Sequence, residues 1–72
     1  MIKNQIGTNA GVVWTTLNAS NSKLSINDLQ DKTQLTEVDI LIAVGWLARE
    51  GKVVIFDEGG IMYFSTYHEM YY

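Results

Sequence analysis

The side chains best suited to acid–base chemistry are few and scattered along this chain. Asp28 with Asp31, and Asp57 with Glu58, are its tight carboxylate pairs, and His68 is its single histidine. Catalytic carboxylates need a pocket that shifts their pKa values, and the sequence around either pair gives no sign of one. His68 lies in an aromatic tail and is interpreted as a surface or partly packed residue rather than a general base. We therefore predict no catalytic residue and no enzymatic activity.

The sequence also lacks the residues that usually bind a metal ion or a cofactor. The chain has no cysteine, which removes disulfides and thiolate metal sites together. One histidine cannot build a zinc site without cysteine partners, and no glycine motif that cradles phosphate is present. The sequence predicts neither a metal site nor a cofactor.

The basic residues do not form the pattern of a nucleic-acid-binding protein. The net charge is −3 and the isoelectric point is about 4.7, whereas phosphate contacts require a clustered excess of Lys and Arg. If the chain does bind DNA, Lys32, Arg49 and Lys52 are the candidate phosphate contacts. The remaining basic residues are Lys3 and Lys23. Binding to nucleic acid is accordingly the disfavoured alternative.

The length of 72 residues predicts a single domain, residues 1–72. A chain this short buries only about 60 % of the surface that its unfolded form exposes, and small domains often gain stability by oligomerising. No apolar run approaches the ~20 residues of a membrane span, and the N-terminus "MIKNQIG" lacks the apolar core of a signal peptide. With cysteine also absent, we expect a cytoplasmic protein without a membrane partner.

Apolar residues at helical spacing predict a first helix that ends near "NASNS". Trp14 belongs to this series and is expected in the core. Gly7 and Gly11 form a G-x-x-x-G pattern, which outside a membrane indicates close packing or a helix start. The residues that define the helix are Ile6, Ala10, Val13, Trp14 and Leu17.

Two similar helix starts follow. "SINDL" and "TEVDI" both read Ser or Thr, two residues, Asp and an apolar residue, beginning at Ser25 and Thr36. Each resembles a capping box, in which the hydroxyl accepts from a backbone N–H of the first turn. They delimit a second helix from Ile26 to about Thr33, a tight turn, and a third helix through "DILIAVGWLAREG", which Gly51 ends. The result is a helix-turn-helix arrangement.

The pattern changes after Gly51. "KVVIF" and "IMYFS" are rich in β-branched and aromatic residues and are separated by "DEGG", which predicts a β-hairpin. "KLS", before the second helix, is the candidate for a short third strand. Both faces of the hairpin are apolar, although a hairpin on a small domain normally has one polar, solvent-exposed face. The second face is expected to be covered by the C-terminal tail or by a partner.

The order helix, short strand, helix, turn, helix and hairpin is that of a winged helix-turn-helix, an α+β fold. "IGTNAGVVWTTL" and above all "AVGWLAREGKV" resemble a small, uncharacterised bacterial winged helix-turn-helix family, a domain of unknown function. The resemblance covers most of the chain. It implies the fold and brings no established activity, ligand or catalytic residue.

The third helix is apolar on two opposite faces. Its inner stripe, which should pack on the first two helices, is predicted to be Ile40, Ala43, Val44 and Leu47. In DNA-binding winged helices the opposite stripe enters the major groove and needs polar residues that read base edges. In this chain the opposite stripe consists of Val38, Leu41, Ile42, Gly45 and Trp46.

Charge makes this outer stripe still less suited to DNA. Glu37 and Asp39 place negative charge at the end that would approach phosphate, and Asp57 and Glu58 occupy the tip of the wing. A contiguous apolar patch is seldom left in water, so we interpret the outer stripe as a protein-binding face. We expect a two-fold homodimer with Trp46 as its anchor. The alternatives are another protein partner, cover by the C-terminal "TYHEMYY", or a DNA-binding transcriptional regulator.

Overall fold

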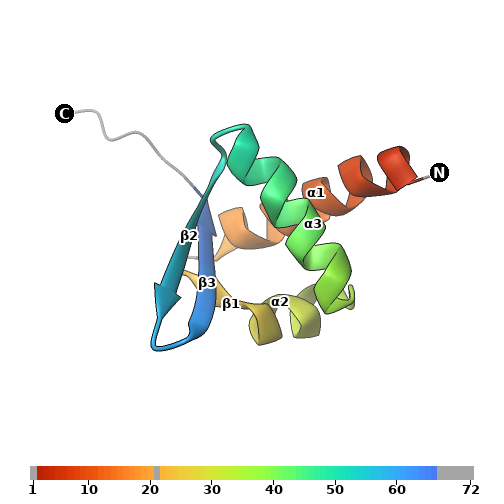
Figure 1. Ribbon diagram of the computed structural model, residues 1–72. Coiled ribbons are helices and arrows are strands. Elements are labelled where there is room, and N and C mark those ends of the chain that lie inside the picture. The colour runs from red at the N-terminus through yellow and green to blue at the C-terminus, as the bar shows by residue number, and fades with distance from the viewer. Residues whose placement is uncertain (1, 21, 67–72) are drawn as a thin grey trace.

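The computed structural model describes residues 2–20 and 22–66 as three helices and a three-stranded sheet. Helices α1 and α3 cross each other, α2 lies beneath them, and the hairpin of β2 and β3 stands at one side (Figure 1). This arrangement is the α+β winged helix-turn-helix that the sequence predicts. The elements are α1 (Ile2–Ala19), β1 (Leu24–Ser25), α2 (Ile26–Thr33), α3 (Glu37–Arg49), β2 (Val53–Glu58) and β3 (Ile61–Thr66).

Both predicted helix starts are present. The Ser25 hydroxyl accepts a hydrogen bond from the Asp28 backbone N–H at 3.1 Å, and the Asp28 carboxylate accepts one from the Ser25 N–H, also at 3.1 Å. This reciprocal pair is a complete capping box. The Thr36 hydroxyl accepts from the Asp39 N–H at 3.1 Å and so begins α3. Between the two helices Gln34 adopts a left-handed conformation with φ 63°, which ends α2 and turns the chain toward α3.

The sheet is antiparallel with β3 in the centre, in the order β1-β3-β2. The predicted third strand exists, because Leu24 pairs with Phe64 and Ser25 with Tyr63. Gly59 and Gly60 connect β2 to β3 with φ values of 63° and 84°, the positive values that a two-residue hairpin turn of this kind requires at both positions.

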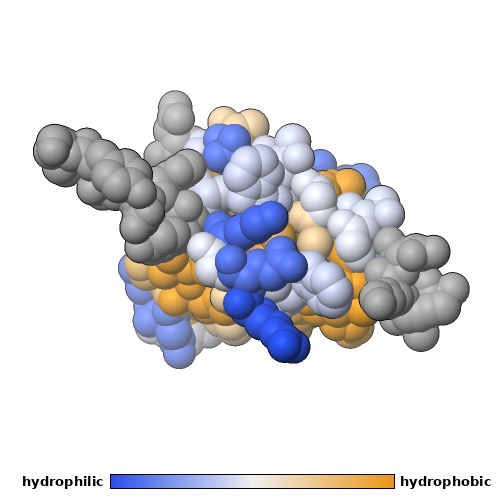
Figure 2. Space-filling model, turned by 90° about the horizontal axis from the view of Figure 1, so that it is seen from above, coloured by the Kyte–Doolittle hydropathy of each residue, from blue (hydrophilic) through white to orange (hydrophobic). Residues whose placement is uncertain are grey.

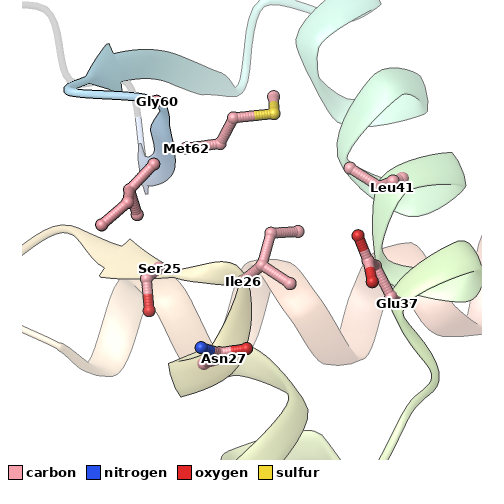
Figure 3. Close-up of a pocket in the computed structure, with 8 residues that line it drawn as sticks. Ser25, Ile26, Asn27, Glu37, Leu41, Gly60 and Met62 are labelled. Carbon is pink, nitrogen blue, oxygen red and sulfur yellow. The ribbon is translucent and has the colours of Figure 1, made fainter.

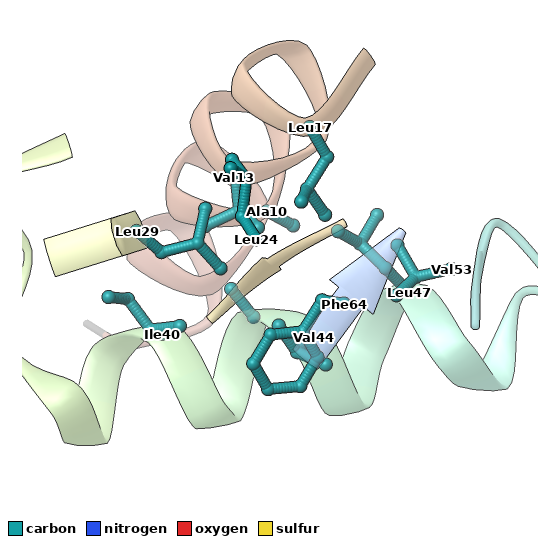
Figure 4. Packing of buried hydrophobic residues seen from close by; sticks show 11 residues of the cluster. Ala10, Val13, Leu17, Leu24, Leu29, Ile40, Val44, Leu47, Val53 and Phe64 are labelled. Carbon is teal, nitrogen blue, oxygen red and sulfur yellow. The ribbon is translucent and has the colours of Figure 1, made fainter. Parts of the chain in front are cut away.

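The core lies where α1, α2 and α3 meet the inner face of the sheet (Figure 4). Phe64 of the central strand and Val44 of α3 belong to the same buried apolar cluster (Figure 4). Trp14 is only partly buried and packs against this cluster from its edge, so the prediction that Trp14 is a full core residue was too strong. The buried residues are Ala10, Val13, Leu17, Leu24, Leu29, Ile40, Ala43, Val44, Leu47, Val53 and Phe64.

Gly7 and Gly11 differ from expectation. Both lie inside α1, and a Cβ atom built on either would meet no atom of another residue within 4 Å. Neither glycine therefore packs closely against another part of this chain, and neither begins the helix, so the prediction for these two glycines is wrong. The space next to both of them is open.

In the described part of the chain, no helix combines the length and the apolar character needed to cross a membrane.

Candidate functional site: the outer face of helix α3

Helix α3 has a buried face and an exposed face of similar apolar character. The predicted inner stripe is confirmed, because Ile40, Ala43, Val44 and Leu47 are at most 4 % exposed. The predicted outer stripe is exposed at all five positions. Its large side chains retain a substantial fraction of their accessible surface: Val38 63 %, Leu41 39 %, Ile42 45 % and Trp46 40 %.

The outer stripe is broader than a single line of contacts. Leu41 and Trp46 are five positions apart, which places them about 140° from each other around an ideal helix. Leu41 lines a pocket next to the hairpin, whereas Trp46 lines one next to α1. Val38, Ile42 and Gly45 lie between these flanks. The stripe therefore presents a central ridge with a hollow on either side.

The hollow beside the hairpin has a volume of about 290 Å³. Ile26 of α2, Leu41 of α3 and Met62 of β3 point into it from three sides (Figure 3). The strand register explains this position of Met62, because Met62 and Phe64 lie on the same face of β3 and only Phe64 reaches the core. The complete lining is Ser25, Ile26, Asn27, Glu37, Leu41, Gly60, Ile61 and Met62.

The hollow beside α1 has a volume of about 220 Å³ and is lined by both tryptophans of the chain. Trp14 and Trp46 belong to its lining, and Gly7 and Gly11 leave it open because they carry no side chain. Its lining also includes the charged residues Glu50 and Lys52.

Charge on the outer face is divided between its two ends. Glu37 and Asp39 lie in the first turn of α3, and Arg49 lies in the last turn. Both placements favour the helix dipole. Seen from above, the molecule has hydrophilic residues across the middle of its surface and hydrophobic areas to both sides (Figure 2).

The three candidate phosphate contacts line three different hollows. Lys32 lies in the last turn of α2 and lines a hollow with the end of α1, whereas Arg49 lies in the last turn of α3. Lys52 follows α3 and pairs with Glu50 at 3.6 Å. Five basic residues in the whole sequence are few for the extended basic track that follows a nucleic-acid backbone.

On the outer face of the hairpin, Lys23 lies over two aromatic rings, a contact that the sequence analysis did not predict. The ammonium group of Lys23 lies 5.5 Å from the Phe56 ring centroid and 5.1 Å from that of Tyr63. It also forms a salt bridge with Glu58. These distances are within the range of cation–π attraction. The alternation in "KLS" contains the signal, because Leu24 faces the core and its neighbour Lys23 must face outward.

The carboxylates considered for catalysis have other positions and partners. Asp28 belongs to the capping box of α2, and Glu58 pairs with Lys23. Asp31 and Asp57 are exposed. His68 lies outside the described residues, as does the rest of the C-terminal tail that was one candidate cover. In residues 2–20 and 22–66, no three His, Cys, Asp or Glu side chains are grouped to hold a metal ion.

Comparison with solved structures shows the fold. The chain is similar over 100 % of its length to the solution structure of protein BT2368 from Bacteroides thetaiotaomicron, with 35 % identity, 100 % of that chain covered and a TM-score of 0.81. A structure of the DNA recognition and protein interaction domains of HOP2 matches 81 % of this chain and 97 % of its own, with 22 % identity and a TM-score of 0.71. At that identity the likeness concerns the fold alone.

Family comparison confirms the resemblance that the sequence suggested. Among curated proteins, none matches this chain. One family model covers residues 1–66, and it describes a winged helix-turn-helix domain of unknown function. The chain therefore belongs to the winged helix-turn-helix domain family DUF2582.

Proposed function

We propose that this protein is a non-enzymatic protein-interaction module that forms a homodimer through the outer face of α3. The observation that carries the proposal is the exposure of Val38, Leu41, Ile42 and Trp46 on one helix, at 39–63 % each. Monomeric proteins seldom expose contiguous apolar patches of this kind. A second copy would remove these side chains from water and add burial that a short chain otherwise lacks.

The same surface is poorly suited to reading DNA. Sequence readout in the major groove requires side chains that hydrogen-bond to base edges, and the ridge of the outer face offers Val38, Ile42 and Gly45. Glu37 and Asp39 bring negative charge to the end of the helix that would approach phosphate. The likeness to the HOP2 structure concerns the fold, and fold analogy alone is a weak argument for function.

Trp46 has the properties of an interface anchor. Buried aromatic side chains account for a large share of binding energy at protein interfaces, and Trp46 is 40 % exposed while it lines the hollow beside α1. An exposed indole gains more from a partner than a small apolar side chain does, because it has more surface to bury.

Sedimentation equilibrium of the wild type and the Ile42→Glu variant tests the proposal. The wild type should be dimeric at micromolar concentration. Ile42→Glu should shift the protein to monomer, or unfold it if the monomer is not stable alone, since a dry interface penalises an unpaired charge. Circular dichroism over a concentration series separates these two results.

A control variant should leave the dimer intact. Thr8→Glu adds the same charge at an exposed position of another helix, α1. A wild type that remains monomeric at high micromolar concentration would contradict self-association. A folded Ile42→Glu variant that stays dimeric would instead assign the interface to another surface, such as the hairpin.

A DNA titration tests the alternative directly. Labelled random and genomic duplexes should show no sequence-selective complex at low salt, and any weak binding should decrease steeply as salt rises. A submicromolar, sequence-selective complex would refute the proposal and support a regulator that binds DNA.

A further inference from the structure

The outer face of α3 has opposite charges at its two ends. Glu37 and Asp39 lie in the first turn and Arg49 in the last. The salt bridges in the described residues are Lys23–Glu58 and Lys52–Glu50. The side chains of Glu37, Asp39 and Arg49 therefore have no ionic partner in this part of the chain.

This charge pattern is self-complementary in one orientation only. From the acidic first turn to Arg49 is ten to twelve residues, or about 15–18 Å along the helix. If a second α3 packs antiparallel on the first, Arg49 of each copy meets the acidic first turn of the other, so the favourable contact forms twice. If the second helix packs parallel, Arg49 meets Arg49 and Asp39 meets Asp39. Like charges placed opposite each other disfavour that arrangement.

Gly45 supports the antiparallel orientation. Position 38 is the middle of the acidic first turn, between Glu37 and Asp39. The point midway between this position and Arg49 lies between residues 43 and 44. Ile42 and Gly45 are equally far from that point, one on each side of it. In an antiparallel pair centred there, Ile42 of each copy faces Gly45 of the other. A Cβ atom on Gly45 would meet nothing within 4 Å in the chain, so packing within the chain does not account for a glycine that lowers helix propensity at this site.

We propose that two copies of this chain pair antiparallel through α3, with Ile42 seated over Gly45 of the partner copy and Arg49 facing the acidic first turn, which carries Glu37 and Asp39, of the partner copy. This inference rests on the proposed function, because it specifies the geometry of that same dimer. The two-fold axis passes between the two α3 helices at the level, along each helix, of residues 43 and 44. An isologous interface of this kind requires each contact to occur twice, once on either side of the axis.

Charge reversal and restoration test this geometry by sedimentation equilibrium at low salt. Arg49→Glu should weaken the dimer by about tenfold or more, because it places like charges together at both ends of the interface. Glu37→Lys with Asp39→Lys should weaken it similarly. The triple variant Glu37→Lys, Asp39→Lys, Arg49→Glu should return to within about threefold of the wild-type dissociation constant, since opposite charges again face each other.

Lys32→Glu is the matched control for Arg49→Glu. Lys32 is also an exposed basic residue in the last turn of a helix, α2, and its reversal changes the net charge and the helix dipole interaction in the same direction. It should leave the dissociation constant unchanged. Circular dichroism confirms that each variant is folded, because lysines in the first turn of α3 oppose the helix dipole.

Failure of the geometry and failure of the proposed function give different results. A monomeric wild type overturns both. A dimeric wild type whose dissociation constant is unaffected by Arg49→Glu overturns the antiparallel pairing and leaves self-association standing. A triple variant that is folded but as weak as Arg49→Glu alone also overturns the pairing, because a correct antiparallel contact must be restored by the exchange of charges.

Discussion

The two faces of α3 have similar composition and opposite surroundings. Ile40 is fully buried and Ile42, two residues later, is 45 % exposed; Leu47 is 4 % exposed and Leu41 is 39 % exposed. Side-chain chemistry does not distinguish the members of either pair. The contacts that α1 and the sheet offer to one face and not to the other decide the difference. The angular position of an apolar residue around the axis of α3 therefore decides whether it is a core residue or an exposed residue that a partner could contact.

The hairpin repeats this contrast with one difference. Its inner face buries Val53 and Phe64 in the core, and its outer face carries Phe56 and Tyr63. There the ammonium group of Lys23 lies over both rings, although Phe56 is still 37 % exposed and Ile61 on the same face is 52 % exposed. Because the rings of this face already have a cation partner within the chain, we propose α3 rather than the hairpin as the interface.

The largest expected effect compares the same substitution on the two faces of α3. Leu47→Ala removes a buried side chain and should cost about 2–5 kcal/mol of unfolding free energy. Leu41→Ala removes a side chain that is already partly exposed and should cost about 1 kcal/mol or less at concentrations where the protein is monomeric. Urea denaturation at low protein concentration measures both variants.

The concentration dependence sharpens this comparison. At high concentration the cost of Leu41→Ala should increase, because binding of a partner stabilises the folded state by mass action. Equal costs for the two variants in dilute solution would show that the two faces of α3 are not distinct.

A smaller effect concerns two exposed glycines, one on α3 and one on α1. Gly45→Ala and Gly11→Ala should each stabilise the monomer by about 0.5–1 kcal/mol, since alanine favours helix and a Cβ atom meets nothing at either site. In the dimer the two should differ, because Gly45→Ala inserts a methyl group between the paired helices. Thermal melts at low and high concentration measure this difference, and identical behaviour of the two variants would count against Gly45 as an interface residue.

The smallest effect concerns the cover of the hairpin. Lys23→Met keeps most of the aliphatic stem and removes the charge, and should cost about 0.5–1 kcal/mol through lost cation–π and ionic contacts. The cost should decrease in high salt, because the salt bridge to Glu58 lies at the surface. Denaturation at low and high salt measures it, with Lys32→Met as the control. A cost that does not depend on salt would indicate that the ammonium group stabilises the fold mainly through the two rings rather than through the salt bridge to Glu58.

Local signals in the sequence were sufficient for the elements and for the register of α3. Ser25 and Thr36 mark helix starts because a hydroxyl accepting from a first-turn N–H is a short-range interaction. Gly59 and Gly60 mark the hairpin turn because they adopt positive φ. With the start of α3 given, the spacing of three and four residues assigns Ile40 and Leu47 to the inner stripe.

Contacts between distant segments were decided only by the tertiary structure. Lys23 covers Phe56 and Tyr63 because β1 pairs with the centre of the sheet, and strand order is a long-range property that local pattern does not contain. The directions of Leu41 and Trp46 were not distinguished in the sequence, because a stripe on a helix does not show which neighbouring element lies on either side. Trp14 looked like a core residue at helical spacing, yet in the structure it is only partly buried and lines the hollow beside α1.

The sequence by itself determined which faces of the helices and strands are apolar, since that depends on residue order and the helical or strand period. Only the packing of those elements decided which apolar faces are covered, since each cover comes from a segment far away along the chain.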